Sequence, residues 1–204
     1  MMRLLIATAN PGKAREFRDM LGDGRFQWSD LSQHPGIAAI EETGHTFRAN
    51  ACLKAAHYAK QLRAWALADD SGLAVDALNG APGVLSARWA QINNSGRGDA
   101  DNNATLLRQL ADVPDDKRTA RFVCVLALSD EQGRIMLTTR DHVEGIILRA
   151  PRGAGGFGYD PLFLVPQLGK TTAELSPEEK HAVSHRGKAL RRMKELVELV
   201  IGNC

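Results

Sequence analysis

ALADDSGLAVDAL, residues 66–78, is the stretch around which the rest of the chain is organised. It begins as an apolar run of strand type, and we expect this strand to stop at Asp69 and Asp70, which Ser71 and Gly72 follow at once. In open α/β sheets, ligands bind beyond the carboxyl ends of the strands. Residues 69–72 are therefore the first candidate site. An acidic turn remains the alternative, because Asp, Ser and Gly also favour turns.

LLIATA, residues 4–9, is a second apolar run of strand length, and NPGK follows it. Asn10 suits the N-cap of a helix, and Pro11 suits its first position. The N–H groups of the first helical turn would then point into a loop beside Lys13. Such a helix start is a ready anion site, although the glycine spacing of phosphate-binding P-loops is absent. A helix cap without a ligand is the alternative.

A second acid pair, Glu41 and Glu42, precedes a helix that Thr46 can cap. Its apolar residues recur at helical spacing, and they are Phe47, Ala51, Ala55, Tyr58 and Leu62. Lys54 lies on a neighbouring face, where it can reach an anion near the helix start or remain an ordinary solvated lysine. Carboxylates at positions 41–42 and 69–70 would together form a hard oxygen site suited to Mg²⁺.

RGAGGFGYDPLF, residues 152–163, interleaves glycines with Phe157, Tyr159 and Asp160. Aromatic rings in a glycine-rich loop can stack on a nucleobase, and an adjacent carboxylate can accept a hydrogen bond from a base N–H. This loop is therefore a candidate base-binding segment. The alternative is that its rings fill the edge of the sheet as buried apolar mass.

SPEE, residues 176–179, has the pattern of a capping box, and Lys180 follows inside the first turn of that helix. Ser184 can cap the long amphipathic helix that ends the chain, which places His185 and Arg186 at its N-terminal end. A cation at this end opposes the helix dipole. The two residues therefore indicate an anionic or acceptor-bearing ligand.

The remaining segments predict a mixed sheet. RFVCVLALS, residues 121–129, is apolar on both faces and reads as a buried central strand, and residues 130–133 turn it into a strand over 133–139 with a longer arm at 142–148. VLSARWAQ, residues 84–91, reads as strand-like. We expect the polar residues 92–103 to be a surface loop, with a helix opening at Asp101 or Asn102.

Composition excludes several classes of protein. The chain has 204 residues, with 26 Lys plus Arg against 24 Asp plus Glu, which is too balanced to predict nucleic-acid or membrane binding. Cys52, Cys124 and Cys204 are widely spaced, which suggests neither a disulfide framework nor a zinc site. No apolar stretch of about 18 residues is present. We therefore expect a cytoplasmic protein.

Six motifs in register resemble the inosine/xanthosine triphosphate pyrophosphatases. They are TANPGK, EETGHTFRANACLKA, ADDSGLAVDAL, GAPGVLSAR, GGFGYDPLF and SHRGKAL. The resemblance implies a house-cleaning enzyme that hydrolyses deaminated purine nucleoside triphosphates (ITP, dITP and XTP) to monophosphate and pyrophosphate. It also implies an α/β fold, a mixed twisted sheet with flanking helices, in one domain over residues 1–204 with two lobes around a central nucleotide-binding cleft. Mg²⁺ as cofactor and a homodimer are further implications.

The resemblance carries roles over to matching positions of this sequence. Asp70 would be the proton acceptor for the attacking water and, with Glu41, a Mg²⁺ ligand. The loop that holds the triphosphate would be Thr8, Ala9, Asn10, Pro11, Gly12 and Lys13. Other substrate-binding positions would be Lys54, Ser71 and Arg88. The base would be bound by Phe157, Gly158, Tyr159, Asp160, Lys180, His185 and Arg186.

Two other functions remain open from the residues themselves. The same set of groups would suit a Mg²⁺-dependent phosphohydrolase that releases orthophosphate from nucleotides. A non-catalytic nucleotide- or RNA-binding module could use the glycine–aromatic loop and the basic outer face of the last helix, although carboxylates near its site would repel a phosphate backbone.

Overall fold

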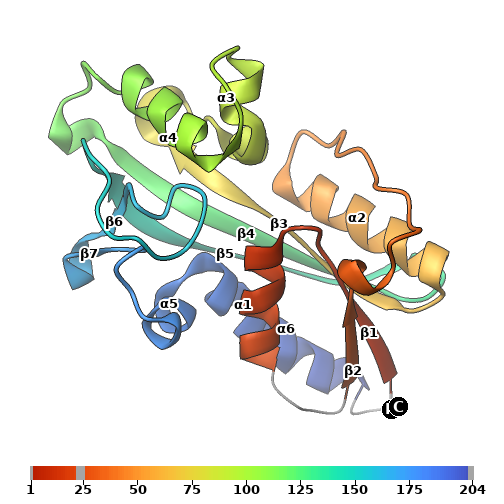
Figure 1. Ribbon diagram of the computed structural model, residues 1–204. Coiled ribbons are helices and arrows are strands. Elements are labelled where there is room, and N and C mark those ends of the chain that lie inside the picture. Colours follow the sequence, from red (N-terminus) through yellow and green to blue (C-terminus); the bar gives the residue numbers. More distant parts are fainter. Residues whose placement is uncertain (1, 22–25, 202–204) are drawn as a thin grey trace. The chain divides into compact units, whose positions relative to one another are not determined.

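The sheet of this chain is mixed, as the sequence predicts. The computed structural model describes residues 2–21 and 26–201, so Cys204 lies outside the described residues (Figure 1). The strand order is β2-β1-β3-β4-β5-β6-β7. β1 pairs in parallel with β2 and β3, whereas β6 pairs antiparallel with β5 and β7. The strands are β1 Met2–Ala7, β2 Phe26–Asp30, β3 Trp65–Val75, β4 Thr119–Ser129, β5 Ile135–Ile147, β6 Phe163–Val165 and β7 Lys170–Thr171.

The helices that Thr46 and Ser176 cap begin where the sequence predicts. Thr46 accepts a hydrogen bond from the Ala49 N–H at 3.1 Å, and Ser176 and Glu179 form the expected capping box. The helices are α1 Pro11–Leu21, α2 Phe47–Leu62, α3 Trp89–Ile92, α4 Gly98–Gln109, α5 Pro177–Val183 and α6 His185–Ile201. No helix among residues 2–21 and 26–201 is both long and apolar enough to cross a membrane.

The chain divides into two compact units, whose boundaries fall inside or beside β3, β4 and β5. The first unit contains Met1–Asp70, Cys124–Asp141 and Arg186–Cys204, and the second contains Ser71–Val123 and His142–His185. In the second unit, one apolar core joins Leu73 of β3, Leu106 of α4 and Phe163 of β6.

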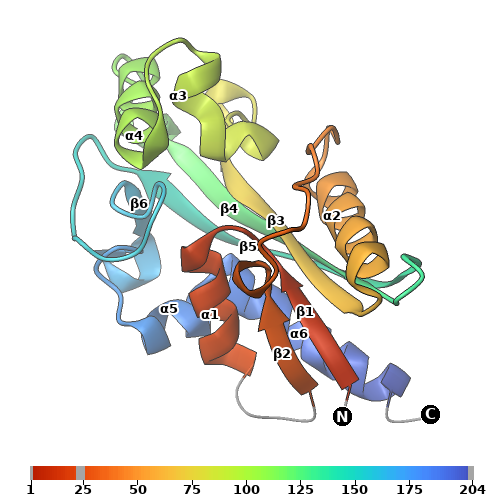
Figure 2. The same ribbon diagram turned by 45° about the vertical axis from the view of Figure 1, so that its right-hand side comes forward.

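In the first unit, the alternation of side chains along the strands separates two cores. Leu4, Ile6 and Leu67 face α1 and α6, while their neighbours in the sequence face α2. Figure 2 shows α2 on the opposite side of these strands from α1 and α6. Each face of this part of the sheet is therefore covered by its own helices.

Four local predictions are corrected by the structure. β3 does not stop at the two aspartates but continues to Val75. Residues 84–91 are not strand-like. They form a 3-10 helix, Gly83–Arg88, and then α3. The Ser86 hydroxyl donates to the Gly83 carbonyl at 2.6 Å, a local hydrogen bond that favours a helical turn over a strand. α4 opens at Gly98, so the irregular part of the polar segment is confined to residues 93–97. The strand over 133–139 and its arm are one continuous strand, β5.

Candidate active site

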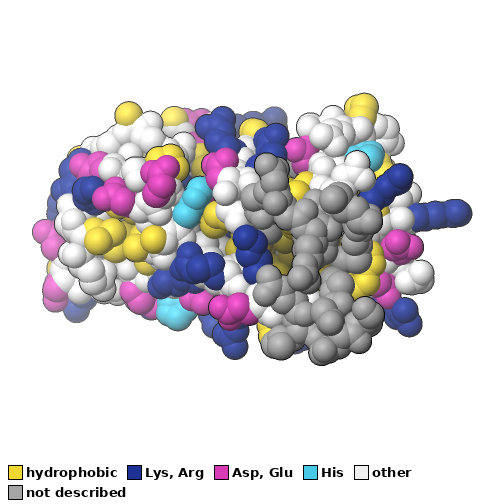
Figure 3. Space-filling view, turned by 90° about the horizontal axis from the view of Figure 1, so that it is seen from below, with side chains coloured by type: hydrophobic (Ala, Val, Ile, Leu, Met, Phe, Trp, Pro, Cys, Tyr) yellow, Lys and Arg dark blue, Asp and Glu magenta, His cyan; other side chains and the backbone are white. Residues whose placement is uncertain are grey.

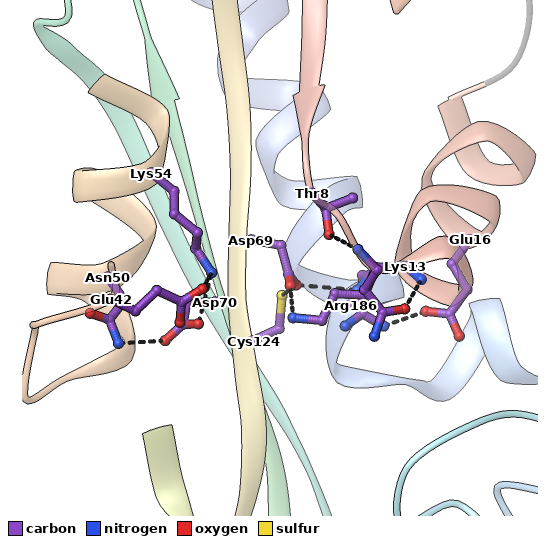
Figure 4. A network of polar contacts seen from close by, with 11 residues as sticks. Thr8, Lys13, Glu16, Glu42, Asn50, Lys54, Asp69, Asp70, Cys124 and Arg186 are labelled. Atoms are coloured by element: carbon purple, nitrogen blue, oxygen red, sulfur yellow. Dashed lines mark hydrogen bonds and ion pairs between the residues drawn. The ribbon is translucent and has the colours of Figure 1, made fainter. Parts of the chain in front are cut away.

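The two aspartates of β3 lie on opposite faces of the sheet (Figure 4). Successive side chains of a strand point to opposite faces, so that Asp69 shares a face with Leu67, and Asp70 shares the other with Ala66 and Ala68. The α1 and α6 helices cover the face of Asp69, and α2 covers the face of Asp70. The pair is adjacent in sequence but belongs to two separate polar networks.

On the α2 face, Asp70 receives hydrogen bonds from two side chains one helical turn apart. Lys54 Nζ lies 2.9 Å from Asp70 Oδ1, and Asn50 Nδ2 lies 3.3 Å from Asp70 Oδ2. Lys54 also contacts Glu42 at 3.0 Å, which brings the loop before α2 to the same ammonium. The Asn50 amide oxygen accepts from the Gly44 N–H at 2.7 Å, and a Cβ on Gly44 would lie 2.5 Å from that oxygen. The loop is thus fixed against α2.

Asp70 is a carboxylate that can take up a proton near neutrality. Burial raises the pKa of Asp70 to about 6, against the opposing effect of the Lys54 ammonium. Burial would lower the pKa of Lys54, but the charges of Asp70 and Glu42 outweigh it and the net shift is upward. Lys54 therefore stays charged beside an acid whose basicity is higher than that of an ordinary aspartate.

On the α1 and α6 face, Asp69 lies between two cations. Its Oδ1 contacts the Lys13 ammonium, and its Oδ2 accepts from Arg186 Nε at 3.2 Å. The thiol of Cys124 donates to the same Oδ2 at 3.2 Å, and Arg186 also pairs with Glu16 of α1. Burial would raise the pKa of Asp69, but Arg186 and Lys13 hold it well below its usual range. Asp69 is therefore ionised at neutral pH.

The loop at the start of α1 has a fixed conformation. The Thr8 hydroxyl accepts from the Asn10 N–H at 3.2 Å, and the Asn10 side chain accepts from the Lys13 N–H at 3.1 Å. Ala9, Asn10 and Pro11 are exposed. An exposed helix N-terminus with a lysine in its first turn attracts anions, because the free N–H groups and the helix dipole both favour negative charge.

In the second unit, Asp160 organises the glycine–aromatic loop. One carboxylate oxygen accepts from the Phe157 N–H at 2.9 Å and from Lys180 at 2.7 Å, and the other accepts from the Thr172 hydroxyl at 2.8 Å. The Lys180 ammonium lies 4.9 Å from the centre of the Phe157 ring. Gly156 has φ +75°, and a Cβ there would lie 2.0 Å from the Asp160 carboxylate. Phe157 and Lys180 are thereby held side by side.

The two aromatic residues of this loop have different environments. Tyr159 is buried in the core of the second unit, and its hydroxyl donates to the Ser86 carbonyl at 2.9 Å. Phe157 is half-buried. His185 is buried and its ring stacks on Phe122, with ring centres 5.0 Å apart. Tyr159 therefore fits the alternative prediction, in which an aromatic ring is buried as apolar mass. The Phe157 ring remains partly accessible, as stacking on a base would require.

A sequence profile of the Ham1 family matches residues 4–196, which is nearly the whole chain. The chain belongs to the Ham1 family. Among its relatives, the dITP/XTP pyrophosphatase of Desulforamulus reducens is 49% identical over 96% of both chains. The dITP/XTP pyrophosphatase of Thermosynechococcus vestitus is 50% identical over 96% of this chain and 95% of the relative.

Solved structures of the Ham1 family have the same fold. The HAM1 protein from Coxiella burnetii has a TM-score of 0.86 and 42% identity, and the match covers 97% of this chain and 98% of that one. The Staphylococcus aureus Ham1 protein has a TM-score of 0.82 and 39% identity, over 96% of this chain and 98% of that one. Both the family and the α/β fold class predicted from the motifs are confirmed.

Three of the residues predicted for the site have environments that differ from the expectation. Arg186 is buried between Asp69 and Glu16, so its charge is already paired within the chain. The carboxylate of Asp160 is engaged by its own loop and by Lys180. Glu41 is exposed, and it is Glu42 that reaches the Lys54–Asp70 pair.

The other predicted residues occupy three kinds of position. Lys13 and Lys54 each contact one of the two aspartates. Ser71 lies on β3 directly after Asp70, and Arg88 is exposed at the end of the 3-10 helix. Sequence reasoning missed Glu16 as a partner in the site. Its spacing of three residues from Lys13 places both on one face of a helix and would have been a signal.

Proposed function

We propose that this Ham1 family protein hydrolyses ITP, dITP and XTP to the nucleoside monophosphate and pyrophosphate, with Mg²⁺ as cofactor, and so removes deaminated purines from the nucleotide pool. The observation that carries the proposal is the buried Asp70 carboxylate, which has a pKa of about 6 and shares the Lys54 ammonium with Glu42. The dITP/XTP pyrophosphatases among its relatives, about half identical over nearly the whole chain, support the choice of substrate.

The carboxylates of Asp70 and Glu42 fit a magnesium ion. Both lie within 3.0 Å of one ammonium, so both face a single cation. Mg²⁺ uses one or two carboxylates together with waters and substrate phosphates, and among residues 2–21 and 26–201 no cluster of three or more acidic, His or Cys side chains forms a ready-made site. We therefore assign the metal to Asp70 and Glu42 rather than to Glu41. When bound, Mg²⁺ would screen the phosphate charge and acidify the attacking water.

The chain's own groups supply the remaining chemistry. Asp70 would accept the proton of the water that attacks the α-phosphorus, because a carboxylate with a pKa of about 6 is ionised at neutral pH and still basic. The start of α1 and Lys13 would hold the triphosphate, and Lys54 would neutralise charge near Asp70. Positioning and charge neutralisation are the main demands of phosphoryl transfer.

Base selection would depend on the glycine–aromatic loop. Phe157 would stack on the purine, and Lys180 beside it would donate to the 6-oxo oxygen of hypoxanthine or xanthine. Adenine carries an amino donor at this position, so ATP would leave a donor facing a donor, a mismatch that costs about 1–3 kcal/mol. Guanine shares the 6-oxo edge, and we expect GTP to be a poor substrate on the ground of the family resemblance.

The experiment that tests the proposal is product analysis. ITP, dITP, XTP, ATP and GTP are incubated with Mg²⁺, and phosphate is assayed with and without added inorganic pyrophosphatase. Phosphate that appears only with the added enzyme, and only from the oxo-purines other than guanine, is the expected result. Phosphate without the added enzyme would identify a phosphohydrolase instead. No product at all, with RNA binding that weakens steeply with salt, would identify a binding module.

We further propose a cytoplasmic homodimer without nucleic-acid or membrane partners. Side chains of both charge signs are interspersed on the face drawn in Figure 3, which agrees with the balanced composition. A nucleic-acid partner would favour a continuous basic patch. Light scattering of the purified chain would test the dimer, and a monomer mass at working concentration would refute it.

A further inference from the structure

Two side chains of α4 form hydrogen bonds with the backbone of Gly158, one with its N–H group and the other with its carbonyl group. The Gly158 N–H donates to Asp99 Oδ2 at 2.6 Å, and the Gly158 carbonyl accepts from Asn103 Nδ2 at 2.9 Å. We call Asp99 and Asn103 the Gly158 clamp. They are four residues apart in the sequence and so lie on one face of the helix.

The clamp completes the hydrogen bonding of the peptide groups around Phe157. The Phe157 N–H donates to the Asp160 side chain at 2.9 Å, and the Phe157 carbonyl accepts from the Asp160 N–H at 3.3 Å. With Gly158 held by α4, every backbone polar group of residues 157 and 158 has a partner within the second unit. A segment rich in glycine would otherwise have many conformations to lose on binding a ligand.

The position of the clamp indicates a role in binding rather than in folding. Asp99 is exposed and Asn103 is half-buried, neither belongs to the apolar core of the second unit, and both contact the backbone of a loop. Gly158 has φ +63°, a conformation that glycine adopts easily, and the clamp bonds both polar groups of this residue next to Phe157. The α4 helix therefore constrains the backbone that carries the Phe157 ring.

We propose that Asp99 and Asn103 are positioning residues for base recognition, which act by fixing Gly158 so that Phe157 and Lys180 keep their spacing. The inference rests on the proposed function in so far as residues 157–160 bind the base. Preorganisation of this kind increases affinity because the loop is ordered before the ligand arrives. Both residues contact the backbone of the loop, so we expect their effect to be confined to the part of the ligand that the loop contacts.

The test compares a ligand with a base to one without. Dissociation constants for ITP and for inorganic tripolyphosphate are measured by calorimetry on the full chain, in buffer without divalent metal so that no turnover occurs. The variants are Asp99→Asn and Asn103→Ala. The matched control is Asp101→Asn, which removes the same charge from the same turn of α4 but whose carboxylate binds the Arg97 N–H at 2.7 Å and not the loop.

We expect each clamp variant to weaken ITP about tenfold, as for the loss of one hydrogen bond, and to leave tripolyphosphate unchanged. Steady-state kinetics should show the same split, with KM for ITP raised and kcat retained, while the control variant matches the wild type. Equal ITP affinity in wild type and both variants would overturn the inference. Parallel loss of ITP and tripolyphosphate with a lower melting temperature would also overturn it, because this indicates a purely structural role.

Failure of the inference is distinct from failure of the proposed function. If the wild type releases no pyrophosphate from ITP, the proposed activity is wrong, whereas the ratio of the two dissociation constants still reports on the clamp. If the wild type is active and the ratio is unchanged in the variants, the activity stands and the clamp does not.

Discussion

Asp69 and Asp70 are neighbours in the sequence and almost equally buried, yet their carboxylates have opposite properties. Asp69 lies between Lys13 and Arg186, and its pKa is held well below the usual range. Asp70 has one lysine and an amide for partners, and its pKa is raised to about 6. Since both side chains are buried, the charges around them decide the difference: two cations lower the pKa of Asp69, whereas Asp70 shares its lysine with Glu42, whose charge raises the pKa of Asp70. Asp69 is suited to hold cations in place, and Asp70 is suited to exchange a proton or bind a metal.

The largest expected effect is on catalysis. Asp70→Asn keeps the shape of the side chain but removes the proposed base and a proposed metal-binding oxygen, so kcat for ITP should fall about 10³-fold. Pyrophosphate release under saturating Mg²⁺ measures this. Retention of more than a tenth of the wild-type rate would contradict the role of Asp70.

The isosteric change on the other face should act on stability. Asp69→Asn removes the carboxylate charge that both Arg186 and Lys13 contact, and a buried cation that loses its counter-charge should lower the free energy of unfolding by about 3 kcal/mol. Urea denaturation compares this variant with Asp70→Asn, which should lose less. Similar losses in both variants would remove the distinction between the two faces.

Sequence reasoning was sufficient for several elements and insufficient for others and for the pairing of side chains. The apolar runs and caps predict β1, α1, α2 and β4 because these signals are local. The alternation that separates Asp69 from Asp70 was also accessible in principle, had β3 been expected to continue beyond them. The partners of Arg186 depend on the packing of α6 against α1, which no local pattern specifies. The choice between Glu41 and Glu42 depends on an irregular loop, where side chains have no fixed periodicity.

A third prediction separates the two glutamates of this loop. Glu42→Gln should raise the Mg²⁺ concentration needed for half-maximal activity about tenfold, because Glu42 and Asp70 both contact the Lys54 ammonium and are the proposed ligands of the metal. Glu41→Gln, an equal loss of charge at an exposed neighbour, should change it little. The magnesium titration of both variants decides the matter, and the reverse order would restore Glu41 as the ligand.

The last prediction concerns the pH dependence of kcat/KM, which changes gradually and needs no substitution. Since the pKa of Asp70 is raised to about 6, its carboxylate takes up a proton as the pH falls through that value. Below this pH the protonated Asp70 could no longer act as the proposed base. At low Mg²⁺ concentration, kcat/KM for ITP should therefore fall about tenfold for each further pH unit below this inflection. Higher Mg²⁺ should move the inflection to lower pH, because a cation favours the ionised carboxylate. An inflection that does not respond to Mg²⁺ would point to a different group.

The difference between the two carboxylates is itself directly measurable. Carbon-13 NMR of the metal-free protein labelled at its aspartate carboxyls, assigned with Asp69→Asn and Asp70→Asn, follows each group through a pH titration. The account predicts that Asp70 titrates near pH 6, and that Asp69 stays ionised down to the pH at which the protein unfolds. Titration of both groups together at the pH of ordinary aspartates would contradict it.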